Sequence, residues 1–186
     1  MATIFLSFSS IIYVDRLISL GINELAVGYT FALSSLAYAL TAPLVNLMKT
    51  RIPRYWLSFV AFWIFAMALM IEGPSSLFEL EPEPELVILG YMILGVAGAL
   101  ALVPLFSSII ESVREKEGIN GKCENLHDKA SALFNACWAL GSVLAPIIGG
   151  AINTNYDFET ACDVMMLVAF IYGLLFFVVF VLPEIL

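Results

Sequence analysis

The chain has very little charge. Only 13% of its 186 residues are Asp, Glu, Lys or Arg, whereas 61% are hydrophobic and the mean hydropathy is +0.97. A water-soluble domain is about 25% charged and about half apolar, so this composition excludes an ordinary soluble domain. The net charge of −8 excludes a basic nucleic-acid-binding protein.

Residues that mark disulfide scaffolds and catalytic centres are also scarce. The chain has 3 cysteines, which form no C-x-x-C pair, and a single histidine, His127, in a charged segment. It contains no Walker loop and no G-x-G-x-x-G sequence. The sequence therefore predicts no metal, no other cofactor and no enzyme activity.

Long uncharged runs occupy most of the chain. A helix needs about 20 apolar residues to cross a hydrocarbon core of roughly 30 Å. Five runs of 17 to 27 residues are near or above this length, and they lie at 25–48, 55–71, 86–110, 130–156 and 164–183. A sixth uncharged segment, 1–14, is too short and is interpreted as half a span or as an interfacial segment.

These runs are predicted to be helices. Only helices and closed barrels satisfy every backbone polar group within lipid, and barrel strands are about 10 residues long and alternate in polarity. The runs are longer than such strands and do not alternate in polarity. The sequence therefore predicts an all-α membrane protein, with one six-helix transmembrane domain over residues 1–186. The predicted spans are approximately 1–14 (partial), 25–48, 55–72, 86–113, 131–152 and 162–182.

The connections between the runs alternate in charge. Seven of the eight Lys and Arg residues lie in two connections, 49–54 and 111–129. The other three connections hold ten of the sixteen acidic residues and only one basic residue; these connections are 15–24, 72–85 and 157–163. Because Lys and Arg mark cytoplasmic loops, loop 114–130 is predicted to be cytoplasmic and the acidic loop 73–85 lumenal or extracellular.

Small residues and prolines recur within the predicted spans. Gly141, Ala145 and Gly149 stand at every fourth position of 131–152, which lets a neighbouring helix approach closely, and Pro146 should bend that helix. Such helices suit a bundle whose parts rock against each other, but also an ordinary tightly packed bundle. The predicted packing and kink positions are Pro43, Gly95, Gly98, Pro104, Gly141, Ala145, Pro146, Gly149 and Gly150.

Polar residues inside membrane spans are the default functional candidates, because their burial in lipid is costly. The predicted cavity-facing residues are Ser34, Tyr38, Glu111, Asn135 and Trp138. The rings of Tyr38 and Trp138 would attract a cation. Hydrogen bonding between helices would equally explain Ser34 and Asn135, and Glu111 is near enough to the end of its span to belong to the interface.

Four stretches carry a family resemblance. GYTFALSSLAYALTAPLVNLMKTRIPRYW (28–56) and LGVAGALALVPLFSSIIESV (94–113) resemble the eighth and tenth spans of major facilitator superfamily transporters. ALFNACWALGSVLAPIIGGAI (132–152) resembles the eleventh span of the vesicular amine transporter branch, and MIEGPSSLF (70–78) resembles the end of the ninth span in its polyamine-type member. The chain thus resembles the C-terminal six-helix half of such a transporter.

The chain also departs from that branch. Two acids that the resemblance implies are replaced by Ala99 on the tenth span and Asn135 on the eleventh, while Glu111 matches a third. The loop after the eighth span keeps Arg51 and Arg54 of the motif G-x-x-x-D-R-x-G-R but has no matching acid. These departures argue against monoamine transport and against proton coupling through this half.

The resemblance implies transport of a small organic solute, with a cationic amine or polyamine as the candidate, by alternating access. We therefore expect the chain to be a fragment, a split half or a half that pairs with another chain. Its expected partners are the lipid bilayer, a solute and a second six-helix half, and no nucleic acid is expected. A non-transporting scaffold subunit of a membrane complex is the alternative, and the sequence does not distinguish a vesicle or organelle from the plasma membrane.

Overall fold

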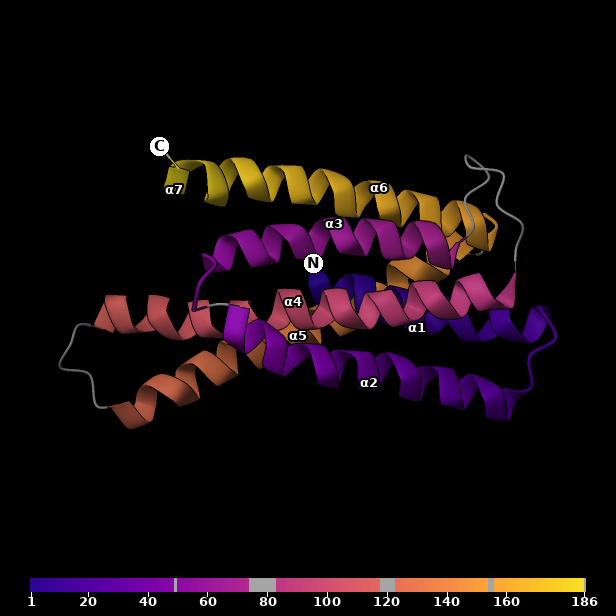
Figure 1. Cartoon of the computed structure of the whole chain (residues 1–186), viewed down its shortest axis with the longest axis horizontal. Helices are drawn as coiled ribbons and strands as arrows, with labels where there is room; N and C mark the ends of the chain where they lie inside the picture. The colour runs from indigo at the N-terminus through magenta and orange to yellow at the C-terminus, as the bar shows by residue number, and fades with distance from the viewer. Residues whose placement is uncertain (49, 74–82, 118–122, 154–155, 186) are drawn as a thin grey trace.

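The fold is a bundle of helices that run along one long axis (Figure 1). The structure is a computed structural model and describes residues 1–48, 50–73, 83–117, 123–153 and 156–185. These ranges contain helices and no strand. In chain order the elements are α1 (Ala2–Ser19), α2 (Glu24–Met48), α3 (Arg54–Glu72), α4 (Pro84–Glu117), α5 (Cys123–Asn153), α6 (Phe158–Phe176), the π-helical turn η2 (Phe177–Val181) and α7 (Leu182–Ile185).

Six of these helices are long and apolar enough to cross a membrane, so the predicted all-α class is confirmed. The first helix differs from the expected partial span. α1 has 18 residues and continues through Asp15 and Arg16. The Arg16 guanidinium is 2.7 Å from the Glu159 carboxylate at the start of α6, so its charge is neutralised by a partner and does not end the helix.

The predicted loops are shorter in the structure. α4 continues to Glu117 and α5 begins at Cys123, because Arg, Lys and Glu favour helices wherever they reach water. Only 118–122 of the predicted loop 114–130 is outside the described residues. Most of the predicted acidic loop 73–85 is also outside them, but α4 starts at Pro84, a residue suited to a first helical position.

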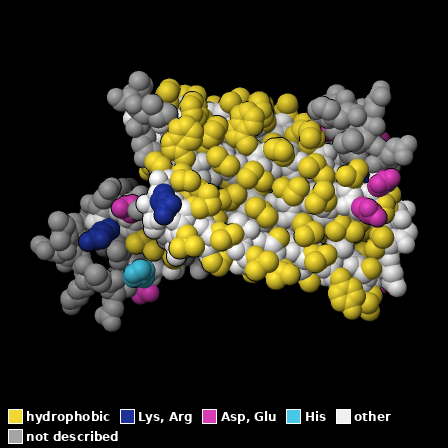
Figure 2. All heavy atoms as spheres, in the orientation of Figure 1, with side chains coloured by type: hydrophobic (Ala, Val, Ile, Leu, Met, Phe, Trp, Pro, Cys, Tyr) yellow, Lys and Arg dark blue, Asp and Glu magenta, His cyan; other side chains and the backbone are white. Residues whose placement is uncertain are grey.

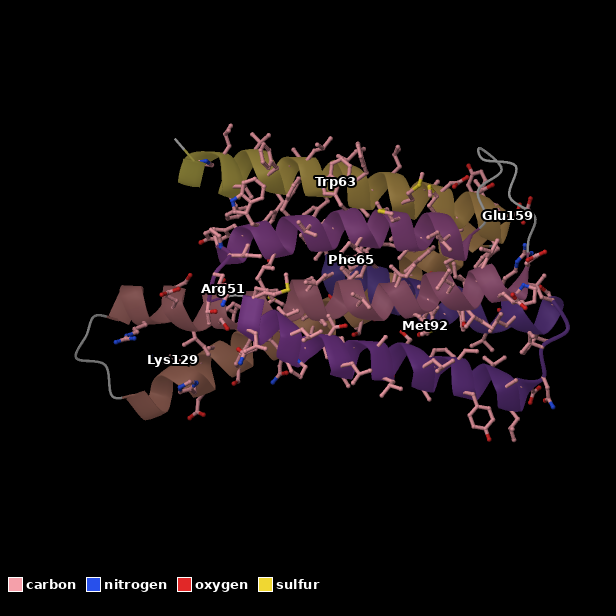
Figure 3. The ribbon with its side chains drawn as sticks, in the orientation of Figure 1. Arg51, Trp63, Phe65, Met92, Lys129 and Glu159 are labelled. Carbon is pink, nitrogen blue, oxygen red and sulfur yellow. The ribbon has the colours of Figure 1, made fainter. Side chains whose placement is uncertain are left out.

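The bundle has two ends of different charge. α2 and α4 end, and α3 and α5 begin, at one end of the bundle, here called the basic end; α1, α3 and α5 end, and α2, α4 and α6 begin, at the other, the acidic end (Figure 1). Figure 3 shows Arg51 and Lys129 at the basic end and Glu159 at the acidic end. Figure 2 shows a broad hydrophobic surface between the two ends, as expected for a protein surrounded by lipid.

The central helices are α1, α3 and α4. α4 packs against α2, α3, α5 and α1, and α3 lies between α4 and α6. The largest side chains buried in this core include Phe5, Phe8 and Tyr13 of α1 and Phe65 of α3. The outer helices α2, α5 and α6 are the least buried, with 6%, 17% and 22% of their most apolar stretches inside the bundle.

Small residues allow the closest helix contacts. A Cβ added to Gly141 of α5 would collide with the Thr3 side chain of α1, and one added to Gly149 would lie 3.2 Å from the ring of Phe8. Ala145, between them, is completely buried. The predicted ladder of small residues on α5 is thus the face that packs against α1, which fits the tight-packing interpretation.

The predicted kink prolines lie within continuous helices. Pro43 is inside α2, Pro104 inside α4 and Pro146 inside α5. Gly98 of α4 faces Leu6 of α1, whose nearest atom would be 3.2 Å from an added Cβ. A Cβ at Gly150 would meet nothing within 4 Å, so a close approach to another helix does not explain that glycine.

Candidate functional site

A cavity of about 430 Å³ lies between α1, α2, α4 and α5. This volume falls in the range of about 300–1,000 Å³ that is usual for small-molecule sites. Among the described residues, none that lines the cavity is charged. Its polar lining consists of hydroxyl and ring groups, which belong to Ser7, Ser10, Ser34, Ser35, Tyr38, Tyr91 and Trp138.

The structure brings together three of the five residues predicted to face a cavity. Ser34 and Tyr38 of α2 and Trp138 of α5 all line it. Glu111 and Asn135 do not line it: Glu111 is exposed near the basic end of α4, and Asn135 is on the exposed side of α5. Of these five candidates, the cavity therefore contains the hydroxyl and aromatic groups but not the acid.

Ser34 also holds two helices together. Its hydroxyl donates a hydrogen bond of 2.9 Å to the carbonyl oxygen of Tyr91 on α4. Gly95 makes this approach possible, because a Cβ there would lie 2.4 Å from the Ser34 carbonyl oxygen. The hydrogen-bonding interpretation thus describes the hydroxyl of Ser34, while the residue still forms part of the cavity wall.

Three aromatic rings are clustered at the part of the cavity nearest the acidic end. Tyr13 and Tyr91 are stacked, with their centroids 4.1 Å apart, and Phe31 meets both rings edge to face. Phe31 and Tyr91 line the cavity, whereas Tyr13 is completely buried. The hydroxyl of Tyr13 has no hydrogen-bond partner among the described residues.

An acid is buried beside this aromatic cluster. Glu72, the last residue of α3, is completely buried. The Ser9 hydroxyl of α1 donates a hydrogen bond to its Oε1, and its Oε2 has no partner in the described part of the chain. Its backbone packs so closely on α4 that a Cβ at Gly90 would lie 2.4 Å from the Glu72 nitrogen.

The sequence analysis counted Glu72 among the acids of the connection 72–85 but also made it the last residue of the predicted span 55–72, and the structure agrees with the second placement. α3 continues through Glu72, and its last turn lies between α1 and α4 rather than in the loop. The next residue, Gly73, packs directly on Cys162 of α6. Three other helices, α1, α4 and α6, therefore surround this acid.

The loop motif is at the opposite end of the bundle. Arg51 is exposed at the basic end (Figure 3). Arg54 is the first residue of α3, and its side chain is outside the described part of the structure. Arg51 is not among the described residues that line the cavity.

Comparison with known families agrees with this architecture. The family model described as Major Facilitator Superfamily matches residues 1–185. The chain belongs to the major facilitator superfamily. This result confirms the resemblance seen in the sequence.

The curated relatives of this superfamily member are carriers. The chain is 30% identical over 152 residues to the MFS-type transporter SLC18B1 of Homo sapiens, which covers 80% of this chain and 32% of that protein. It is 29% identical over 170 residues to the protein of that name from Mus musculus, covering 87% and 37%. The chain thus spans about a third of the length of the relatives it matches. No solved structure matches it significantly.

Sequence reasoning missed the part of this major facilitator chain that is most unusual chemically. Glu72 directly follows the uncharged run 55–71. This position was the one feature of the sequence that could have indicated a buried acid. Ser9 and Tyr13 lie in the segment judged too short to span. Their proximity to Glu72 depends on how three helices pack, which no spacing in the sequence records.

Proposed function

We propose that this chain forms one six-helix half of a secondary transporter, which moves a small organic solute across a membrane by alternating access. The observation that carries the proposal is the cavity between α1, α2, α4 and α5. Superfamily membership supports it, since carriers of this kind bind their solute near the midplane between two halves. The wall observed here would form one side of that site.

The lining of the cavity favours an organic cation, with an amine or polyamine as the proposed class. Tyr38, Tyr91 and Trp138 supply aromatic faces that attract ammonium groups, and the serine hydroxyls can accept hydrogen bonds from them. Because no described residue of the lining is charged, the counter-charge must come from another part of the carrier. A second half, or an acid behind the wall, would supply it.

The exposed surface of α2 supports a second half as partner. Only 6% of its most apolar stretch is buried within this chain. Its exposed residues include Gly28, Ala32, Ser35 and Ala39, at spacings of three and four, and such small residues let another helix pack closely. α2 also exposes large apolar side chains, such as Leu36 and Leu40, which suit lipid contact. The exposed side chains of α6 are chiefly of this large apolar kind, and include Leu167, Phe170, Leu174 and Leu175.

Uptake into proteoliposomes tests the proposal. The chain would be reconstituted in its natural polypeptide, or with the half that completes it, and assayed with putrescine, spermidine and serotonin under an imposed pH gradient. Trp138→Ala should reduce uptake strongly. Trp63→Ala is the matched control, since Trp63 is equally exposed (37% against 40%) but lies on α3 outside the cavity wall (Figure 3). Equal effects of both changes would argue against this cavity as the solute site.

A scaffold subunit is the second candidate. The uncharged lining of the cavity favours it, because a carrier for cations normally exposes an acid to its solute. Folded protein that takes up no solute, and that co-purifies stoichiometrically with an unrelated membrane protein, would support the scaffold over the carrier.

A further inference from the structure

Glu72 has no described partner that could balance a negative charge. Arg16 is paired with Glu159, and the described partner of Glu72 is the neutral Ser9 hydroxyl, from which it accepts a hydrogen bond. An ionised carboxylate that is buried without a cation is very costly, and such groups usually become neutral instead. The surroundings therefore suit a carboxylic acid rather than a carboxylate.

The groups that the structure couples to Glu72 from the packed helices carry no formal charge when protonated. Ser9 of α1 donates a hydrogen bond to it, and Tyr13 of α1, Tyr91 of α4 and Cys162 of α6 are close enough to interact with it electrostatically. Asp163, Arg16 and Glu159 are close enough to interact with Cys162 in the same way. In a neutral acid, Oε1 is the carbonyl oxygen that accepts from Ser9, and Oε2, which has no described partner, carries the proton.

The aromatic cluster connects this acid to the cavity. Ser9 and Tyr13 are four residues apart and so share one face of α1. Tyr13 is stacked on Tyr91, and Tyr91 lines the cavity. A separation of these two rings would admit water from the cavity to the carboxyl group, whereas the closed stack keeps it dry.

We propose that Glu72 is a proton-binding site of this carrier, protonated when the Tyr13–Tyr91 stack is closed and able to release its proton to cavity water when the stack opens. In that step the O–H bond at Oε2 breaks, water takes the proton, and the carboxylate is left facing the cavity. The link to solute movement rests on the proposed function, whereas the protonation of Glu72 does not.

Infrared spectroscopy tests the protonation directly. The full natural polypeptide would be placed in lipid nanodiscs, and its spectrum recorded from acidic to alkaline pH. A protonated carboxylic acid has a carbonyl stretching band that a carboxylate lacks. We expect such a band to persist at neutral pH in the wild type, to disappear in Glu72→Gln, and to remain in Glu85→Gln, which changes an exposed glutamate at the same end of the bundle.

Two further variants keep the test decisive if Glu72→Gln does not fold. Ser9→Ala removes the hydrogen bond to Oε1, so the band should shift to higher frequency without loss of intensity. Tyr91→Ala removes one ring of the stack, so the shift of the band in heavy water should become several-fold faster. A merely structural role of Ser9 or Tyr91 would produce neither spectral change.

Three results would overturn the proposal: no band at neutral pH in the wild type, a band that Glu72→Gln leaves unchanged, or a band whose frequency Ser9→Ala does not alter. A requirement for sodium in place of the proton would also overturn it. Failure of the carrier function has a different signature, because no solute would then be taken up while the infrared band stayed. If both proposals hold, Glu72→Gln should abolish uptake driven by a pH gradient but retain solute exchange.

Discussion

The contact between α2 and α4 at Gly95 gives a sharp prediction of stability. A Cβ at this position would lie 2.4 Å from the Ser34 carbonyl oxygen, whereas ordinary contacts begin at 3.4 Å. Gly95→Ala must therefore move the two backbones apart by roughly 1 Å, because a carbonyl group within a helix cannot turn away. Overpacking of this kind costs about 1–3 kcal/mol.

The same displacement would break a hydrogen bond. The Ser34 hydroxyl is 2.9 Å from the Tyr91 carbonyl, and a separation of about 1 Å places it beyond hydrogen-bonding distance. Hydrogen bonds between membrane helices are worth about 0.6–1.7 kcal/mol. The total expected loss for Gly95→Ala is thus about 2–5 kcal/mol of unfolding free energy.

Thermal unfolding in detergent, followed by circular dichroism, would measure this loss. The matched control is Gly28→Ala on α2, where an added Cβ would meet nothing within 4 Å and the change should be neutral or slightly stabilising. If Gly95→Ala unfolds at the same temperature as the wild type, the close approach of α2 to α4 described here is wrong.

Three further predictions concern single contacts. Ser34→Ala should lower the unfolding free energy by only about 1 kcal/mol, clearly less than Gly95→Ala in the same melt. Arg16→Gln should cost about 1 kcal/mol or less because the pair with Glu159 is partly exposed, and a double-mutant cycle with Glu159→Gln should show coupling that salt weakens. Ala39→Trp should reduce co-purification with the completing half, whereas Leu174→Trp on the large-residue face of α6 should not.

The number and type of the spans could be predicted from sequence because they depend on single segments. An uncharged run of sufficient length must become a helix in lipid, and this holds whatever lies beside it. The first helix is the exception that shows the limit. Asp15 and Arg16 ended the uncharged run. Arg16, however, pairs with Glu159 of α6, 143 positions along the chain. An analysis of one segment at a time does not include such a partner.

The cavity could be predicted in part. Ser34, Tyr38 and Trp138 are polar or amphipathic residues within apolar runs, and the structure places all three in one wall. Asn135 has the same sequence signature and, like Trp138, is exposed, but it does not line this cavity. Which exposed position of a helix lines a cavity depends on how the neighbouring helices pack, and a span that is apolar on all sides provides no pattern from which to calculate it.

Lipid explains why the surface was harder to interpret than the core. In water, an apolar face indicates burial, but lipid tails are as apolar as leucine, so hydrophobicity cannot separate a lipid-facing helix from one that packs against protein. Residue size can. α6 exposes chiefly large side chains such as Leu174, whereas α2 exposes both large ones such as Leu40 and a row of small ones that includes Ala32 and Ala39. Since small residues gain little from lipid but allow two helices to approach, the row of small residues on α2 is the face at which we propose that a second half packs.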